Sequence, residues 1–246
     1  GRGRSAALAM RRSRTQRRVI IKARVVRQKG AHFRAAPLAR HLTYLKRDGV
    51  DREGSEGRLF DADSDSADGE LFAERCEDDR HHFRFIVSPE DAAEMEDLRA
   101  FTRELMDDMA HDLGTRLDWV AVDHWNTDNP HIHILVRGKA DDGQNLVIDR
   151  DYIREGMRGR AEERVTAELG RRTEREIAQA LRREVSAERW TSLDRSLQRL
   201  QDDCGLIDLR PDPTGHARSD RALLIGRATA LERLGLADAH GPACWT

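Results

Sequence analysis

The feature that most constrains the fold is a pair of short apolar stretches joined by a polar turn, at residues 118–138. The first stretch reads D-W-V-A-V-D-H-W, the second reads H-I-H-I-L-V-R-G, and N-T-D-N-P lies between them. β-Branched and aromatic residues are typical of strands, and clusters of Asn, Asp and Pro are typical of turns. The sequence therefore predicts two antiparallel strands joined as a hairpin.

Three of the ten histidines in the chain lie in this hairpin, at His124, His131 and His133. Side chains alternate along a strand, so His131 and His133 share one face, and the turn brings His124 alongside them. Three imidazoles suit Zn, Mn, Fe, Co or Ni and leave positions open for substrate or water. An H-x-H pair alone would be read as surface histidines, but the third histidine favours a metal site of the catalytic kind.

Three further segments have strand character. V-I-I-K-A-R-V-V at residues 19–26 and H-H-F-R-F-I-V at residues 81–87 alternate and are β-branched or aromatic. A short strand at residues 145–148 is predicted after the turn D-D-G. Together with the hairpin, these segments predict five strands.

Helices are predicted between and after the strands. Pro37 suits the first turn of a helix that ends before Gly49. Ser88 is a candidate N-cap for a second helix that runs to about residue 112. The sequence from residue 149 to about 200 is helical and heavily charged, and the tail from Arg210 is predicted to be a loop. We expect an α+β fold with helices on one face of a largely antiparallel five-stranded sheet.

Charge is distributed unevenly along the chain. Residues 1–47 contain fifteen Lys or Arg and no Asp or Glu, whereas residues 51–80 contain twelve acids and four bases. A basic segment indicates a polyanion partner such as nucleic acid, and a solvated tail is the alternative. We expect a basic disordered arm at 1–17, a core at 18–150 with an acidic loop at 51–80, and a charged helical extension at 151–246 that leads into a further domain.

Cysteine content and hydropathy narrow the class of protein. Cys76, Cys204 and Cys244 are odd in number and far apart, which argues against a disulfide framework and against a cysteine zinc site. No apolar run approaches the roughly 18 residues of a membrane helix, and the first residues lack the apolar core of a signal peptide. The sequence therefore predicts a cytoplasmic protein without membrane insertion.

Three motifs carry a resemblance to a known family. H-W-N-T-D-N-P-H-I-H-I-L-V resembles the three-histidine motif of plasmid and T-DNA relaxases, which are HUH endonucleases of the P-type mobilisation class. L-T-Y-L-K-R-D-G around Tyr44 is similar to the motif with their nucleophilic tyrosine. H-H-F-R-F-I-V-S-P around Ser88 is similar to the motif whose serine contacts DNA near the nick. The resemblance covers about residues 19–151, is nearest the VirD-two-like relaxases, and departs at Asn126, where many relatives carry an acid.

The resemblance implies an HUH relaxase-like fold and a transesterification. In that reaction a tyrosine attacks a phosphodiester at an origin of transfer, forms a 5′-phosphotyrosyl link, releases a 3′-hydroxyl and so initiates conjugative transfer. Tyr44 is the implied nucleophile, and His124, His131 and His133 are the implied ligands of a divalent metal ion. Mg²⁺ or Mn²⁺ is usual in the family, whereas three imidazoles suit Zn²⁺, Co²⁺ or Ni²⁺ as well.

Other residues are candidates for DNA binding or nucleophilic attack. The cations Arg40, Lys46 and Arg47 flank Tyr44 and could hold phosphates and favour its phenolate. Packing beside the neighbouring leucines is the structural alternative for Tyr44. His41 lies one turn before Tyr44 on a similar helix face and is the alternative nucleophile, since some relaxases outside this class attack with histidine.

Two candidates have both a structural and a functional interpretation. Ser88 could donate to DNA or cap its helix, and Trp125 could stack on a base or pack in the core.

Expected partners are single-stranded DNA, a coupling protein, a type IV secretion system and accessory relaxosome proteins, and transfer of the protein to the recipient cell is left open. Alternatives are a rolling-circle replication initiator, in which the tyrosine generally follows the histidines, and a non-catalytic DNA-binding regulator.

Overall fold

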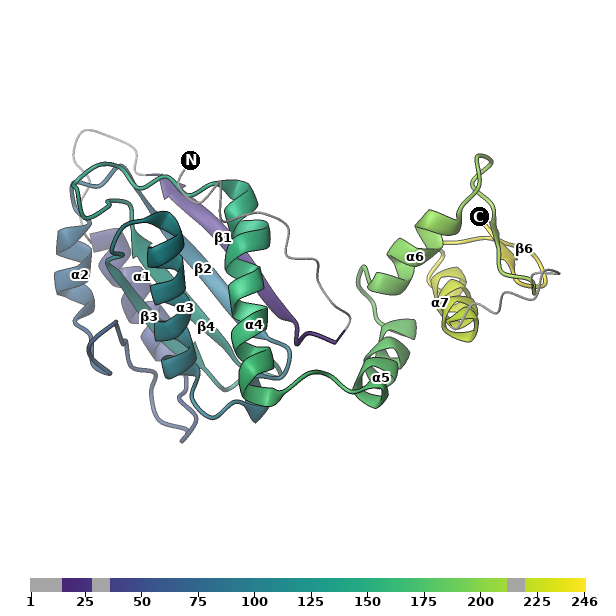
Figure 1. The fold of residues 1–246 in the computed structure, drawn as a ribbon, viewed down its shortest axis with the longest axis horizontal. Coiled ribbons are helices and arrows are strands. Elements are labelled where there is room, and N and C mark those ends of the chain that lie inside the picture. Colours follow the sequence, from purple (N-terminus) through teal and green to yellow (C-terminus); the bar gives the residue numbers. More distant parts are fainter. Residues whose placement is uncertain (1–14, 28–35, 212–219) are drawn as a thin grey trace. The chain divides into compact units, whose positions relative to one another are not determined.

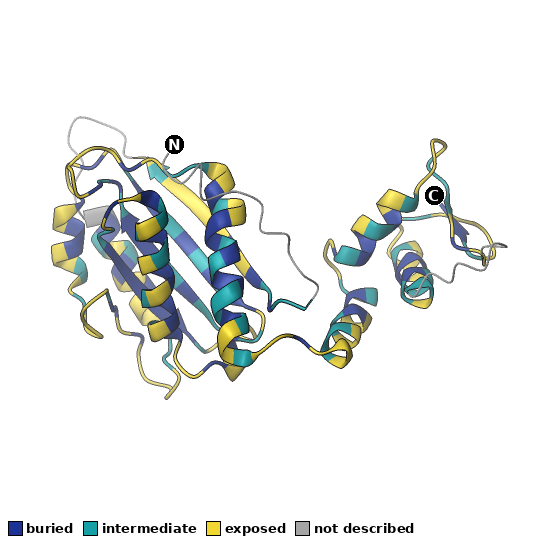
Figure 2. Ribbon diagram, in the orientation of Figure 1, coloured by how far each residue is buried: buried dark blue, intermediate teal, exposed yellow. Residues whose placement is uncertain are grey.

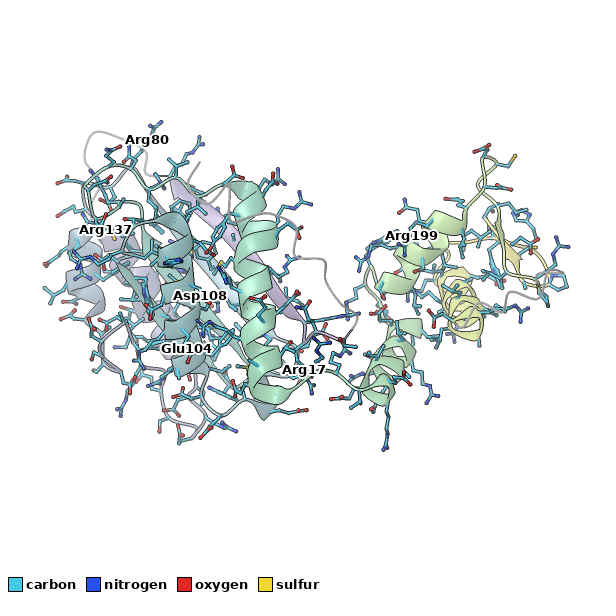
Figure 3. All side chains as sticks on the ribbon, in the orientation of Figure 1. Arg17, Arg80, Glu104, Asp108, Arg137 and Arg199 are labelled. Atoms are coloured by element: carbon cyan, nitrogen blue, oxygen red, sulfur yellow. The ribbon has the colours of Figure 1, made fainter. Side chains whose placement is uncertain are left out.

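The computed structural model describes residues 15–27, 36–211 and 220–246, and the first fourteen residues of the predicted basic arm lie outside them. The chain divides into two compact units, with the boundary after Arg171. Arg17 is buried, and its guanidinium lies 3.1 Å from Asp91 and donates to the carbonyl of Gly170 (Figure 3). The chain is thus fixed in place immediately before the first strand.

Four antiparallel strands form the sheet of the first unit, in the order β1-β2-β4-β3 (Figure 1). They are β1 (Val19–Arg27), β2 (His81–Pro89), β3 (Trp119–His124) and β4 (His131–Arg137), as the alternating segments predict. The predicted fifth strand at residues 145–148 is wrong. Asn145 forms a single bridge to Lys139, because the turn at Gly143 returns the chain for one residue pair only.

The first two helices lie between β1 and β2. Helix α1 (Ala36–Asp48) confirms the helix predicted from Pro37. Helix α2 (Gly69–Arg75) lies inside the acidic segment, where the Asp68 side chain caps it by accepting from the backbone N–H groups of its first turn. The sequence pattern did not predict α2.

The helix predicted with Ser88 as its N-cap starts nine residues later, after Asp97. Ser88 pairs with Ile20 inside the β1–β2 ladder, so it is not an N-cap. A 3₁₀ turn, η1 (Ala92–Glu94), follows β2, and helix α3 (Leu98–Leu113) begins after Asp97. The Asp97 carboxylate accepts from two backbone N–H groups of the first turn, which is the capping bond that the prediction placed at Ser88.

A π-helical segment, η2 (Tyr152–Met157), leads directly into α4 (Arg158–Leu169). Arg164 holds α4 to α3, with its guanidinium 2.6 Å from Asp108 and in contact with Glu104 (Figure 3). Figure 1 shows both helices in front of the sheet and α1 behind it. In Figure 2 the exposed residues of α3 and α4 lie on the side away from the strands.

Helices cover both faces of the sheet, so the expectation of helices on one face is wrong. One cluster of buried side chains joins α3, η2 and α4 to one sheet face, through β4 residues that include Ile132, Ile134 and Val136. A second cluster joins α1 and α2 to Val120, Val122 and neighbouring apolar residues of the other face. Alternation puts these two sets of side chains on opposite faces.

The second unit has its own core. It contains α5 (Glu174–Val185), α6 (Ser192–Leu200), α7 (Arg221–Arg233) and a three-stranded sheet in the order β5-β7-β6. The strands are β5 (Ile207–Asp208), β6 (Ala239–Gly241) and β7 (Cys244–Trp245). The helices to about residue 200 confirm the prediction, but the loop predicted after Arg210 is wrong for the described residues, which add α7 and two strands. Throughout the described ranges, every helix is too short or too polar to cross a membrane.

Candidate metal centre

The β3–β4 hairpin brings the three predicted histidines together. His124 lies directly opposite His131, and His133 lies opposite Val122, so all three belong to the sheet face covered by α1. One nitrogen from each ring can be chosen such that all three lie within 4.8 Å of one another. The ring centroids are 4.6 to 5.3 Å apart. The predicted convergence of the three imidazoles is therefore present.

Hydrogen bonds at the outer edge of the trio orient the rings. His131 Nδ1 lies 2.9 Å from the Asn129 carbonyl oxygen, and His124 Nε2 lies 3.0 Å from the Leu45 carbonyl oxygen. A carbonyl oxygen only accepts, so each of these ring nitrogens carries the proton and donates it. His131 Nε2 and His124 Nδ1 are then left with lone pairs, which is the arrangement found around metal-bound histidines.

The inner nitrogens have the chemistry of a ligand set. His131 Nε2 and His133 Nε2 lie 3.2 Å apart, and two lone pairs at that separation need a proton or a cation between them. Burial, with His124, His131 and His41 nearby, lowers the pKa of His133 to about 3. His133 therefore stays neutral near pH 7, which is the protonation state that binds a metal. The three residues fit a divalent metal ion.

The C-terminal end of α1 is bound to the histidine hairpin. The Leu45 carbonyl accepts from His124, and Gly49 packs so closely that an added Cβ would lie 2.5 Å from His124 Cδ2. A side chain at position 49 would thus displace the histidine ring. Tyr44 directly precedes Leu45, and its side chain is 52% exposed, with the Arg47 guanidinium 5.8 Å from its ring centroid. The helix carrying Tyr44 is in this way fixed to the trio.

Ser88 lies on the same sheet face as the histidines. Ile86 of β2 is directly opposite His133 of β4, and Ser88 is two residues further along β2, partly exposed. Arg40, Lys46 and Arg47 are exposed on α1. The structure thus gathers the predicted tyrosine helix, serine strand and histidine hairpin on one face of the sheet.

Trp125 does not share this face. It is partly buried against the cluster under α3 and α4, its Nε1 donates to Asp123 at 2.8 Å, and the Arg52 guanidinium lies 5.0 Å from its ring. Asp123 is buried and lies 3.0 Å from Arg99. Asp123 therefore points away from the histidines. Among the described residues, no carboxylate lies close enough to the three histidines to serve as a fourth metal ligand.

His41 lies on α1, is half-buried, and belongs with Arg84 and His82 of β2 to a second basic group on this face. Burial and the nearby Arg84 lower the pKa of His41 to about 4. Arg84 donates from Nε to Nε2 of buried His82 at 3.0 Å. The detectable signal is the alternation H-F-R-F-I in β2, which puts His82, Arg84 and Ile86 on the histidine face.

Comparison with known families agrees with the chemistry of this site. A family model described as "Relaxase: MobA/VirD2-like, nuclease domain" matches residues 61–164. The matched span contains Ser88 and all three histidines, and Tyr44 precedes it. The match supports a relaxase family and a DNA endonuclease. No curated protein and no solved structure gives a significant match to the chain.

Proposed function

We propose, from the relaxase match and the histidine geometry, that this protein is a site- and strand-specific relaxase of the P-type class that nicks single-stranded DNA at an origin of transfer. The observation that carries the proposal is the convergence of His124, His131 and His133 beside the end of the helix that bears Tyr44. His124, His131 and His133 would hold a divalent metal ion. That ion would supply a Lewis acid for the scissile phosphate.

Tyr44 is the proposed nucleophile. Its hydroxyl oxygen forms a bond to phosphorus while the bond from phosphorus to the 3′-oxygen breaks, giving a 5′-phosphotyrosyl enzyme and a free 3′-hydroxyl. Solvent accepts the phenolic proton, because the Tyr44 side chain is about half exposed. The Arg47 guanidinium, 5.8 Å from the ring centroid, adds positive charge beside the phenol. Arg40 and Lys46 contribute positive charge for the backbone on the same helix.

Tyr152 is unsuited to attack. It is fully buried, its hydroxyl donates to Asp112 at 3.2 Å, and burial with that carboxylate raises its pKa above the ordinary value. His41 is less suited than Tyr44 because its side chain on α1 is half-buried, with Arg84 of β2 nearby. Ser88, on the histidine face, is proposed to contact DNA near the nick. A coupling protein and a type IV secretion system are the proposed partners.

The test is adduct formation with single-stranded DNA from the element that encodes this chain. The protein is incubated with Mn²⁺ or Mg²⁺ and with a chelator, and SDS-resistant adducts are mapped by mass spectrometry. A metal-dependent adduct on Tyr44 is the expected result. An adduct on His41 would change the nucleophile and retain the enzyme, whereas tight binding to origin DNA without any adduct would favour the non-catalytic regulator.

Two tyrosine variants sharpen this test, because the chain has only two tyrosines. Tyr44→Phe removes one hydroxyl and is expected to abolish the adduct while folding and DNA binding persist. Tyr152→Phe removes the other and is expected to retain the adduct. Equal cleavage by Tyr44→Phe and the parent protein would refute the assignment.

A further inference from the structure

A row of cations continues from the histidine site across the same sheet face. Lys22 of β1 lies opposite Ile86, which lies opposite His133, and Arg24 of β1 lies opposite Arg84 of β2. Arg84 in turn lies opposite Leu135, two residues from His133 on β4. Such diagonal positions are roughly 7–8 Å apart, so Arg84 is a direct neighbour of the trio.

Arg84 carries a charge that no acid compensates. It is half-buried, and within the described ranges it forms no ion pair, nor do Arg24 or Lys22. Residues 1–47 contain no Asp or Glu, so the undescribed segments on either side of β1 have no carboxylate to offer. Burial and the proximity of Arg24 lower the pKa of Arg84 below its ordinary value. A half-buried guanidinium in this setting calls for an anion.

Arg137 shows what a compensated arginine on this sheet face looks like. It is also on β4, but its guanidinium lies 2.9 Å from buried Asp79 and 3.9 Å from Asp118 (Figure 3). Arg137 therefore has two carboxylates as partners, whereas among the described residues the only hydrogen-bond acceptor of Arg84 is the ring of His82. The contrast sets Arg84 apart from the structural arginines of the fold.

His82 holds Arg84 in position. Its Nε2 accepts the Arg84 Nε–H, so the ring is neutral and its proton lies on Nδ1. That Nδ1 is buried and has no partner in the described part of the chain. A buried polar atom without a partner is uncommon and calls for an explanation. The hydrogen bond to the ring fixes the guanidinium through Nε and leaves its terminal N–H groups for an anion.

We propose that Arg84, with Arg24 and Lys22 beside it on β1, forms a binding subsite for a backbone phosphate of single-stranded DNA next to the scissile one. This inference rests on the proposed function, which supplies the DNA at the histidine site. The shared chemistry is the phosphate oxyanion, and guanidinium groups bind it through paired N–H donors. His82 is a positioning residue for this subsite.

The matched control lies on the same strand. Arg24 and Arg27 are both exposed arginines of β1, but alternation places Arg24 on the histidine face and Arg27 on the other. Affinity for a fluorescent origin oligonucleotide is measured by anisotropy at several salt concentrations, with a chelator present to prevent cleavage. Arg84→Gln is expected to weaken binding about 10-fold, and Arg27→Gln less than about 2-fold.

The salt dependence reports the number of phosphates neutralised. Each phosphate contact on a single strand contributes about 0.7 to the slope of log affinity against log salt. Arg84→Gln is therefore expected to lower the slope by about 0.7, and Arg27→Gln to leave it unchanged. Equal slopes for Arg84→Gln and the parent would overturn the subsite.

Single methylphosphonate linkages identify the phosphate. Each linkage flanking the nick is made neutral in turn, and one position is expected to weaken binding to the parent but not to Arg84→Gln. His82→Phe is expected to reduce the effect at that linkage alone, which a general loss of structure would not do. If Arg84→Gln and the parent respond alike at every linkage, Arg84 contacts no backbone phosphate and the proposal is wrong.

Further measurements distinguish a DNA phosphate from free inorganic phosphate, and distinguish failure of the subsite from failure of the proposed nuclease. Inorganic phosphate that saturates an Arg84-dependent site at millimolar concentration, without competing with the oligonucleotide, would overturn the DNA assignment. A Tyr44 adduct together with Arg84→Gln binding like the parent would retain the nuclease and reject the subsite. Absence of any adduct, with the Arg84-specific losses present, would reject the nuclease and retain the subsite.

Discussion

The two faces of the four-stranded sheet are made by alternate residues of the same strands, yet they differ in kind. The face under α3 and α4 packs into a large apolar cluster, and its buried carboxylate, Asp123, has Arg99 and Trp125 as partners. The other face is apolar only under α1 and α2. The same face also carries His131, His133 and Arg84.

The difference shows how one sheet can combine stability with a site. On the α3–α4 face, the buried carboxylate of Asp123 finds its hydrogen-bond partners within the fold. On the other face, His82 has an unpartnered nitrogen and Arg84 has no carboxylate among the described residues. Residues adjacent in the sequence, such as Asp123 and His124, therefore have unrelated roles because they point to opposite faces.

The largest expected effect is on the histidine face. His131→Ala removes one of three ligands and is expected to lower metal affinity and metal-dependent nicking by at least about 100-fold. Because His131 is only partly buried, stability without metal is expected to change little. Calorimetric titration with Mn²⁺, oligonucleotide cleavage and thermal unfolding in chelator measure the three quantities. Unchanged metal affinity would remove His131 from the ligand set.

A smaller effect, on stability and not on metal binding, is expected from a substitution of Asp123, the residue before His124. Asp123→Asn weakens the charged hydrogen bonds to Arg99 and Trp125 and is expected to destabilise the protein by about 1–3 kcal/mol. Metal affinity should be unchanged, since Asp123 points to the α3–α4 face. Denaturant unfolding and Mn²⁺ titration test this pair of outcomes. A loss of metal affinity with unchanged stability would place the carboxylate at the metal and break the comparison of the two faces.

Much of the site could be predicted because it depends on local geometry. The H-x-H spacing and the turn at residues 126–130 are sufficient to bring three imidazoles together on adjacent strands. The helix from Pro37 could be predicted for the same reason, because the signals for its start and its end are local in the sequence. Ser88 illustrates the limit: Ser-Pro-Glu is a good helix start, but pairing with Ile20, far away in sequence, keeps Ser88 in a strand.

The sequence pattern could not predict that Arg137 has a carboxylate partner and that Arg84 has none among the described residues. Both arginines alternate with apolar residues in strands, and local spacing treats them alike. Asp79, which compensates Arg137, is 58 residues away in the chain, and only the fold brings them together. Helices on both faces could not be predicted for the same reason, since strand order depends on contacts between distant segments.

The smallest expected effect is a pH dependence that belongs to the histidine face. Burial, with Arg84 and His41 nearby, lowers the pKa of His82 to about 4 from the ordinary 6.5. Between those values the unfolded chain binds the proton and the folded protein does not, so His82 makes stability fall as pH decreases from 6.5 towards 4. His41 and His133 act in the same direction, because their pKa values are lowered too.

His82→Phe is therefore expected to reduce, without abolishing, the loss of stability between pH 7 and pH 5, measured as urea midpoints in chelator. Asp123→Asn, on the other face, should leave that loss unchanged, and an equal loss in His82→Phe and the parent would mean that His82 is not held neutral by the fold.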